Sequence, residues 1–347
     1  MVDRPERVRH ILALAPNWLG DAAMCTPALR ALKRRFPEAR LTVAGRDSVC
    51  ALLEGLPWID ALAETPHRPG LLALTRLGWR FRPHARGLCV VFRHSFRAAL
   101  LAGLTGARRR IGQRRDNRHW LLTDTVEPRR EAGRVTPAYT AFEYLGLVAA
   151  LGCEDDGRGL ELHADEQELA AVRACFGGGG PVVAMAPGAA FGPSKQWPAA
   201  RFAAVADLLH ARAGARITLL TGPGEEALRT EIAEQTRAPL LDARTDGPGV
   251  RRMKAVLAAS DLLVCNDTGP RHVAIAFGRP VVCVMGPTSP AYTASPWERG
   301  EVIRVDVDCG PCQQPVCATD HRCMTGIPPE RVAEAALRWL PPQAGDL

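Results

Sequence analysis

Short apolar runs alternate with amphipathic stretches along this chain, and the alternation limits the fold more than any other feature. In the first half, five apolar runs are typical of strands: Val8–Ala15, Arg40–Ala44, Ile59–Ala63, Leu88–Phe92 and Arg109–Gly112. The clearest helix candidate is Asp21–Phe36, which has apolar residues at helical spacing and is followed by Pro37. Strands separated by helices pair in parallel, so the pattern predicts an α/β fold.

A second series of the same kind begins at Pro181. Its strand candidates are Val182–Ala186, Arg216–Thr221, Pro239–Leu241, Asp261–Cys265 and Val281–Met285. Its helix candidates are Phe202–Arg212, Glu225–Gln235, Val250–Ala259 and Arg271–Phe277. We therefore predict two Rossmann-like domains, residues 1–163 and 164–327, followed by a helix and tail at 328–347. In open parallel sheets ligands bind beyond the carboxyl ends of the strands, so the informative residues should lie on the loops after strands.

Composition and charge restrict the environment and the partners. The N-terminal apolar stretch Ile11–Ala15 is too short for a secretion signal, and no run is long enough to span a membrane, so we expect a cytoplasmic protein. The net charge is +7, and six arginines fall within Arg108–Arg118. Such a field attracts a phosphate-bearing glycolipid, nucleic acid or an acidic membrane surface, although a solvated arginine-rich loop has the same composition.

Asp21 follows the first predicted strand and the turn residue Gly20. An aspartate at a helix start can cap free backbone N–H groups. It can equally project from the strand end as a general base, because a sugar hydroxyl that attacks an activated carbon loses its proton late. The residues alone leave both interpretations open.

Two loops of the second half have the features of a diphosphate site. Lys195 lies just before a helix start, after the strand that ends at Ala186. Asp267, Thr268 and Gly269 follow another strand and open a helix that carries His272 one turn later. A lysine and a helix N-terminus at the same sheet edge favour bound phosphate groups, and His272 could donate to a phosphate or sugar oxygen. A surface lysine and a structural histidine are the alternatives.

The segment Gly222–Ala227 fits G-x-G-x-x-A, and Asp242 lies twenty residues after Gly222. This is a loose match to a dinucleotide-binding loop, and Pro223 lacks an N–H that such a loop would offer. We favour Glu225 as a carboxylate for ribose hydroxyls, with a helix-dipole role as the alternative.

Four of the eleven cysteines are clustered as C-x2-C-x4-C-x5-C: Cys309, Cys312, Cys317 and Cys323. The short spacing suggests a structural zinc site, and His321 adds a candidate ligand. A redox-labile pair or plain free thiols are the alternatives. The other seven cysteines lie among apolar residues, where reduced thiols behave as small hydrophobic groups.

In combination these segments resemble glycosyltransferase family 9, the ADP-heptose:lipopolysaccharide heptosyltransferases, and within it the heptosyltransferase II type. The resemblance rests on residues 17–43, 94–122, 186–198 and 266–290 and on the four-cysteine tail. It implies a GT-B fold, with two Rossmann-like domains that face a central cleft. The acceptor domain comes first and the donor domain second. It also implies inverting transfer of heptose from ADP-heptose to the inner core of lipopolysaccharide, without a cofactor or a required catalytic metal.

The resemblance also assigns roles to individual residues. Asp21 matches the family's proposed catalytic base, and Lys195 matches its phosphate-binding lysine. Asp267, Thr268, Gly269 and His272 match the donor block, and Glu225 matches a ribose-binding acid. Pro270 and Arg271 depart from the Leu or Met often found there. From the arginine cluster we predict that Arg114 and Arg118 contact the anionic acceptor.

Other functions fit parts of the same sequence. Within this fold the donor could be another nucleotide sugar, or the acceptor another glycan. A dinucleotide-dependent oxidoreductase would use Gly222–Ala227, and a nucleic-acid-binding protein would use the arginine cluster. We expect no nucleic-acid partner, and we expect peripheral contact with the inner membrane surface.

Overall fold

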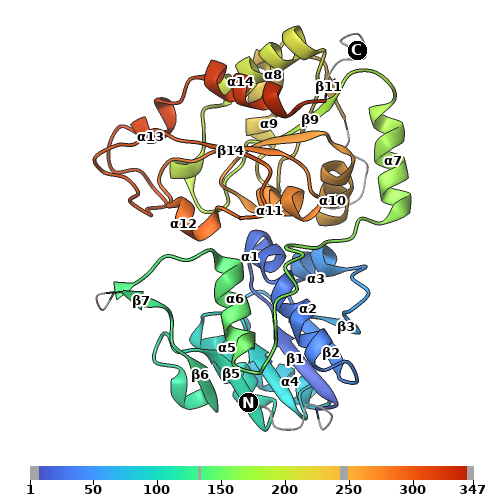
Figure 1. Ribbon diagram of the computed structural model, residues 1–347, viewed down its shortest axis with the longest axis vertical. Helices are drawn as coiled ribbons and strands as arrows, with labels where there is room; N and C mark the ends of the chain where they lie inside the picture. The colour runs from blue at the N-terminus through green and yellow to red at the C-terminus, as the bar shows by residue number, and fades with distance from the viewer. Residues whose placement is uncertain (1–7, 132–133, 243–248, 342–347) are drawn as a thin grey trace. The chain divides into compact units, whose positions relative to one another are not determined.

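The computed structural model describes residues 8–131, 134–242 and 249–341. The chain divides into two compact units, Met1–His163 and Ala164–Leu347. Each unit contains a six-stranded parallel sheet covered by helices (Figure 1). The prediction of two parallel-sheet α/β domains is therefore confirmed.

The first sheet has the strand order β3-β2-β1-β4-β5-β6. Its strands are β1 (His10–Leu14), β2 (Arg40–Gly45), β3 (Ala61–Glu64), β4 (Leu88–Val91), β5 (Arg109–Gln113) and β6 (Asp124–Val126). The helices of this unit are α1 (Leu19–Met24), α2 (Thr26–Arg35), α3 (Asp47–Leu53), α4 (Leu71–Phe81), η2 (Arg82–His84), α5 (Phe96–Leu104), η3 (His119–Leu121) and α6 (Thr140–Ala149). A two-stranded ribbon, β7 (Arg130–Glu131) and β8 (Arg134–Val135), completes it.

The second sheet repeats this order as β11-β10-β9-β12-β13-β14. Its strands are β9 (Val182–Ala186), β10 (Arg216–Leu219), β11 (Leu240–Leu241), β12 (Leu262–Asn266), β13 (Val281–Val284) and β14 (Gly300–Ile303). Its helices are α7 (Glu166–Phe176), η4 (Pro193–Lys195), α8 (Ala199–Ala213), α9 (Glu226–Gln235), α10 (Val250–Ala259), α11 (Gly269–Ala276), α12 (Pro290–Thr293), α13 (Arg322–Thr325) and α14 (Pro329–Trp339).

The central strands are buried on both faces, which explains their unbroken apolar sequence. All five residues of β9 and of β12 are buried, and so are the four residues of β4. Helices on both sides remove both faces from water, and this arrangement is typical of parallel sheets. The strand order reverses between β1 and β4 in the first unit and between β9 and β12 in the second. In open α/β sheets the loops diverge at such a position, and ligands commonly bind there.

The predicted helix Asp21–Phe36 is wrong as a single element. The structure breaks it at Cys25, and a second helix begins at Thr26. Pro27 lies in the first turn of α2 and has no N–H to continue the ladder of α1. The Thr26 hydroxyl instead donates to the Ala23 carbonyl oxygen at 2.7 Å.

The C-terminal helix α14 packs against α8 and also contacts β13 and β14 of the second unit. Figure 1 shows α8 and α14 side by side above that sheet. The buried face of α14, including Val332, Ala333 and Ala336, belongs to the core of the second unit. Among the described residues, no helix is long and apolar enough to cross a membrane.

Candidate functional site

Three polar loops of the second unit leave the sheet at the same edge. They follow β9, β10 and β12, which are neighbours in the sheet, and they carry Lys195, Glu225 and Asp267 respectively. Because the strands are parallel, the carboxyl ends of all three meet at that edge. The predicted donor residues therefore share one region of the fold.

Lys195 lies against Asp267. Its Nζ is 2.6 Å from Asp267 Oδ2 and 3.2 Å from the Asp267 carbonyl oxygen. The ammonium group also lies 4.9 Å from the centre of the Phe191 ring. The Lys195 side chain is 12% exposed, so most of its length is fixed while part of it still reaches solvent. A lysine held this way presents its charge at a fixed position on the sheet edge.

Asp267 is the centre of a buried charge network. Its Oδ2 accepts a second hydrogen bond from the Thr288 hydroxyl at 2.8 Å, and its Oδ1 accepts one from Arg271 Nη1 at 3.1 Å. Burial alone would raise the pKa of Asp267. The positive charges of Lys195 and Arg271 outweigh that effect and hold its pKa well below the ordinary value. Asp267 is only 5% exposed and is ionised, so its carboxylate positions Lys195 and Arg271.

Arg271 is fully buried, and its guanidinium is bonded on every side. It donates twice to the Glu298 carboxylate, at 2.7 Å each, as well as to Asp267 and to Thr293 Oγ1. In the sequence, Arg271 was notable only because it departs from the residues often found at this position in the family. A charged residue in the first turn of a helix gives no signal that its side chain is buried, because the partner Glu298 lies 27 residues away.

His272 follows Arg271 and is 3% exposed. Burial first, and then the neighbouring Arg271 charge, lower its pKa to about 3, so the imidazole is neutral at physiological pH. Its Nδ1 is buried and makes no hydrogen bond within the described residues. A buried polar atom left without a partner is uncommon and often marks a place where a ligand supplies one.

The helix α11 begins at this edge with Gly269. Thr268 is its N-cap residue in extended conformation, and its side chain makes no capping bond. Asp267 does not cap this helix, because both of its carboxylate oxygens bond to side chains. Pro270 is in the first turn, where a backbone N–H would have no partner within the helix, so its absence removes no hydrogen bond.

Glu225 lies at the N-cap position of α9, with its side chain turned back toward the sheet. Its Oε2 accepts a hydrogen bond from the Gly222 N–H at 2.6 Å. The carboxylate packs so closely on Gly188 that a Cβ there would lie 2.0 Å from Oε1. A side chain at position 188 would therefore displace the Glu225 carboxylate, which lies directly beside the segment that leads to Lys195.

Asn266 supports the loop that carries Lys195, and it was not singled out from the sequence. It is fully buried at the end of β12. Its Nδ2 donates to the Pro187 carbonyl oxygen at 2.6 Å, and its Oδ1 accepts from the Trp197 N–H at 3.3 Å. The side chain thereby holds both ends of the loop that carries Lys195. The available signal was an asparagine that ends an otherwise apolar strand.

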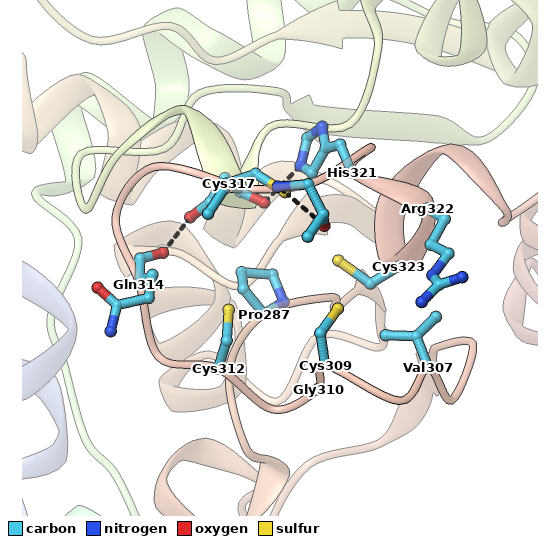
Figure 2. Close-up of a pocket in the computed structure, with 13 residues that line it drawn as sticks. Pro287, Val307, Cys309, Gly310, Cys312, Gln314, Cys317, His321, Arg322 and Cys323 are labelled. Carbon is cyan, nitrogen blue, oxygen red and sulfur yellow. Dashed lines mark hydrogen bonds between the residues drawn. The ribbon is translucent and has the colours of Figure 1, made fainter.

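The four clustered cysteines line one pocket next to this loop (Figure 2). The segment Cys309–Cys323, called here the cysteine loop, bonds to Ser194 from three sides. Ser194 Oγ donates to Gln314 O at 2.6 Å, Ser194 N donates to Pro315 O at 3.1 Å, and His321 Nε2 lies 2.6 Å from Ser194 O. The loop therefore fixes the residue immediately before Lys195.

The metal-binding prediction for this loop receives no geometric support. Within the described residues, no three or more His, Cys, Asp or Glu side chains are arranged to hold a metal ion. His321 Nε2 is occupied by the Ser194 carbonyl oxygen, which leaves only Nδ1 as a possible ligand atom. The structural zinc stays a prediction, and we derive no chemical step from it.

In the first unit, Asp21 lies in the first turn of α1, after β1. The alternative that it is the N-cap is wrong, because Trp18 occupies that position. Burial, and then the Asp21 charge, raise the pKa of both Cys25 and Tyr144, so these groups lie near the carboxylate. Tyr144 in turn packs edge-on against Phe92, which follows β4, with ring centres 5.5 Å apart. Asp21 thus belongs to a cluster at the carboxyl ends of β1 and β4.

Arg93 and His94 extend this cluster and were not predicted from the sequence. Arg93 donates to the carbonyl oxygens of Ala15 and Ala44, which fixes the ends of β1 and β2. The His94 ring lies 6.4 Å from the Tyr144 ring. Burial, and then the charge of Arg115, lower the pKa of His94 to about 4. Its buried Nε2 makes no hydrogen bond within the described part of the chain.

The two arginines predicted to contact the acceptor differ in their surroundings. Arg114 is exposed, pairs with Glu127 at 2.9 Å and lines a surface pocket with Arg115 and Arg130. Arg118 has no exposed surface, and it donates to the carbonyl oxygens of Arg93, Ser95 and Gln113. The prediction for Arg118 needs correction, because a buried guanidinium bonded to three backbone groups holds the loop together instead of meeting a ligand.

Comparison with known proteins identifies the family. The sequence pattern of glycosyltransferase family 9 (heptosyltransferase) matches residues 75–322, which is more than half of the chain. The chain belongs to glycosyltransferase family 9. It is therefore a glycosyltransferase, which sets aside the oxidoreductase and the non-enzymatic nucleic-acid-binding protein.

Relatives of this family-9 chain match almost its full length. It is 28% identical to lipopolysaccharide heptosyltransferase 2 of Salmonella typhimurium, over 93% of this chain and 96% of the relative. The structure of E. coli ADP-heptose lipopolysaccharide heptosyltransferase II matches with a TM-score of 0.77 and 25% identity, over 95% and 98% of the two chains. A family-9 glycosyltransferase from Veillonella parvula matches with a TM-score of 0.84 at 22% identity, over 95% and 97%. The fold is thus the GT-B fold of these enzymes.

Proposed function

We propose that this glycosyltransferase moves heptose from ADP-heptose to the inner core of lipopolysaccharide, with inversion at the anomeric carbon. The names of the full-length relatives support the substrate class. The single observation that carries the proposal is the Lys195 ammonium group, held by Asp267 beside the N-terminus of α11. A fixed positive charge next to a helix N-terminus is suited to a diphosphate leaving group.

The proposed donor site uses the second unit. The Lys195 ammonium has three hydrogens, of which two point at oxygens of Asp267, so one stays available to a phosphate oxygen. The backbone at Thr268 and Gly269 adds the partial positive charge of the helix N-terminus. Glu225 uses Oε2 for Gly222 and keeps Oε1 for ribose hydroxyls. The neutral His272 finds the missing partner of its Nδ1 in a sugar or phosphate oxygen.

The proposed transfer is a single displacement. The acceptor hydroxyl oxygen bonds to the anomeric carbon, and the bond from that carbon to the phosphate oxygen breaks. The hydroxyl proton passes to the Asp21 carboxylate, and the electron pair leaves with ADP. Lys195 and the α11 N-terminus stabilise the charge that develops on the leaving phosphate.

Arg114 is the arginine that we propose for acceptor anions, and Arg118 supports its loop. We further propose that the enzyme works at the inner face of the cytoplasmic membrane.

Calorimetric titration tests the donor assignment. The protein is titrated with ADP, ADP-heptose, UDP-sugars and NAD(H), and each titration is repeated on Lys195→Ala. We expect ADP and ADP-heptose to bind, and we expect the substitution to weaken both. In an activity assay, the unmodified protein should transfer heptose to a lipopolysaccharide acceptor that has not yet received this heptose. Binding of UDP-sugars without ADP-heptose affinity would show that the donor is another nucleotide sugar.

A further inference from the structure

The net positive charge of the chain comes from the first unit. That unit carries 26 Lys and Arg against 17 Asp and Glu, whereas the second carries 18 against 20. Residues 65–115 contain twelve arginines and no acidic residue. A field of one sign attracts an anionic partner of extended size.

Helix α4 lies within this acid-free stretch and is apolar on two sides. Leu74, Leu77 and Phe81 are buried in the core of the first unit. On its other side Leu71, Leu72 and Trp79 are 67%, 78% and 67% exposed. A helix of a water-soluble domain has little reason to expose three large apolar side chains, and such a surface marks an interaction site.

The exposed apolar surface continues onto the neighbouring elements. Helix α4 packs against α5, and α5 contacts η3. Phe96 of α5 and Trp120 of η3 are both exposed, and their ring centres lie 5.9 Å apart. Arg97 donates to the Pro69 carbonyl oxygen at 3.2 Å, which joins the start of α5 to the segment before α4. The five apolar residues therefore lie on adjoining elements of one unit.

Exposed arginines accompany these apolar residues: Arg68, Arg76, Arg80, Arg82 and Arg97. Within the described residues none of the five is paired with a carboxylate. Arg82 instead lies over the Trp79 ring at 4.3 Å. We call the five apolar residues together with these five arginines the α4 face.

We propose that the α4 face docks on an anionic phospholipid bilayer. This proposal rests on the proposed function, because the acceptor is then a membrane glycolipid. Leucine and tryptophan side chains enter the boundary between headgroups and acyl chains, and arginines remain at the phosphates with their stems along the apolar surface. Two weak signals, apolar insertion and basic charge, together give stable membrane attachment.

Charge and side-chain type favour this partner over two others. A nucleic acid would pair with the arginines, but its phosphate backbone offers nothing to exposed Leu71 and Leu72. A second copy of the chain would cover the apolar residues, but two faces that each carry five unpaired arginines repel one another. Of these three partners, only an anionic bilayer satisfies both components of the face.

The test is flotation of the full-length protein with vesicles of phosphatidylcholine alone or of phosphatidylcholine with phosphatidylglycerol. Two variants each remove one component, Leu72→Ser/Trp79→Ser and Arg76→Ser/Arg80→Ser. The matched control for the arginine variant, Arg173→Ser/Arg237→Ser, removes two exposed arginines from the second unit. We expect the protein to bind the anionic vesicles and each α4 variant to bind them roughly tenfold more weakly or worse. The control should bind like the unmodified protein.

Equal binding to neutral vesicles, or anionic binding that neither α4 variant weakens, would overturn the proposal. Two further outcomes would also overturn it: tight binding of DNA without vesicle binding, or a dimer that Leu72→Ser/Trp79→Ser dissociates. Calorimetry with ADP on the same variants separates this proposal from the proposed function. Lost vesicle binding with intact ADP affinity concerns the α4 face alone, and lost ADP-heptose affinity in the unmodified protein concerns the donor assignment alone.

Discussion

Asp21 and Lys195 are charged residues of different units, and the proposed mechanism gives them different roles. Asp21 is held in the first turn of a short helix, close to two groups whose proton affinity its charge increases. Lys195 is held by a buried carboxylate. A base must accept a proton, whereas a lysine at a phosphate must only keep its charge in place.

Asp21→Asn should lower kcat for heptose transfer by roughly 10²–10⁴-fold, because an amide of the same shape cannot accept the proton. ADP binding, measured by calorimetry, should be unchanged because the donor residues are on the second unit. Circular dichroism checks that the variant is folded. Turnover equal to that of the unmodified enzyme would show that Asp21 is not the base.

Asp267→Asn should lower the free energy of unfolding by about 3–5 kcal/mol, because it leaves buried Lys195 and Arg271 without their shared anion. Lys195→Met should cost less, since Asp267 keeps Arg271 and Thr288 as partners. Urea denaturation of both variants measures the difference. Glu234→Gln on exposed α9 is the control. If Lys195→Met destabilised the protein as much as Asp267→Asn, Asp267 would not be the centre of the network.

At this scale the sequence predicted where the proposed donor residues lie, but not which charged side chains are buried. Lys195, Glu225 and Asp267 follow strands, and the order of strands brings them to one edge. Whether a charged side chain is buried depends on partners far along the chain, and neither Glu298 for Arg271 nor Arg93 O for Arg118 could be read from spacing.

At the scale of elements, the cysteine loop and the turn η4 act as one piece. Three hydrogen bonds to Ser194 join residues more than 100 positions apart. The loop contains little regular structure between β14 and α13, so its contact with η4 is what fixes the approach to Lys195.

Ser194→Ala should remove one of these bonds, at a cost of about 1 kcal/mol in unfolding free energy. The larger effect should be on the donor, because Lys195 follows directly and loses its fixed position. We expect KM for ADP-heptose to rise several-fold, with a smaller change in kcat. Ser194→Thr keeps the hydroxyl and should restore part of the affinity. An unchanged KM in Ser194→Ala would mean that the loop does not position Lys195.

Helices and central strands were the most predictable elements. Val182–Ala186 and Val250–Ala259 were predicted with the same bounds that the structure has. The edge strands β6 and β14 were missed, because they are short, only partly buried and contain Asp124 and Glu301. These two edge strands have no continuous apolar run, so the hydrophobic pattern alone did not reveal them.

At the scale of the whole molecule, each unit contains one buried neutral imidazole beside positive charge: His94 in the first and His272 in the second. Their pKa values, about 4 and about 3, lie below the ordinary value of about 6.5. The unfolded chain therefore binds protons as the pH falls below 6.5, while the folded chain does not. Stability must decrease through that window, by at most about 1.4 kcal/mol per pH unit for each histidine.

The carboxylates with lowered pKa values affect stability in a different pH range. Asp267 and Asp156 stay ionised in the folded protein well below their ordinary pKa, so their contribution is lost only below about pH 4. Between pH 7 and pH 5 the histidines with lowered pKa values therefore dominate: His94 and His272, together with the partly exposed His84. Urea denaturation at pH 7.5, 6.5 and 5.5 should show falling unfolding free energy, and His94→Gln/His272→Gln should flatten that dependence. General repulsion from the growing net positive charge is the same in both proteins. If the double variant kept the full dependence of unfolding free energy on pH, the acid sensitivity would come from that repulsion and not from the buried imidazoles.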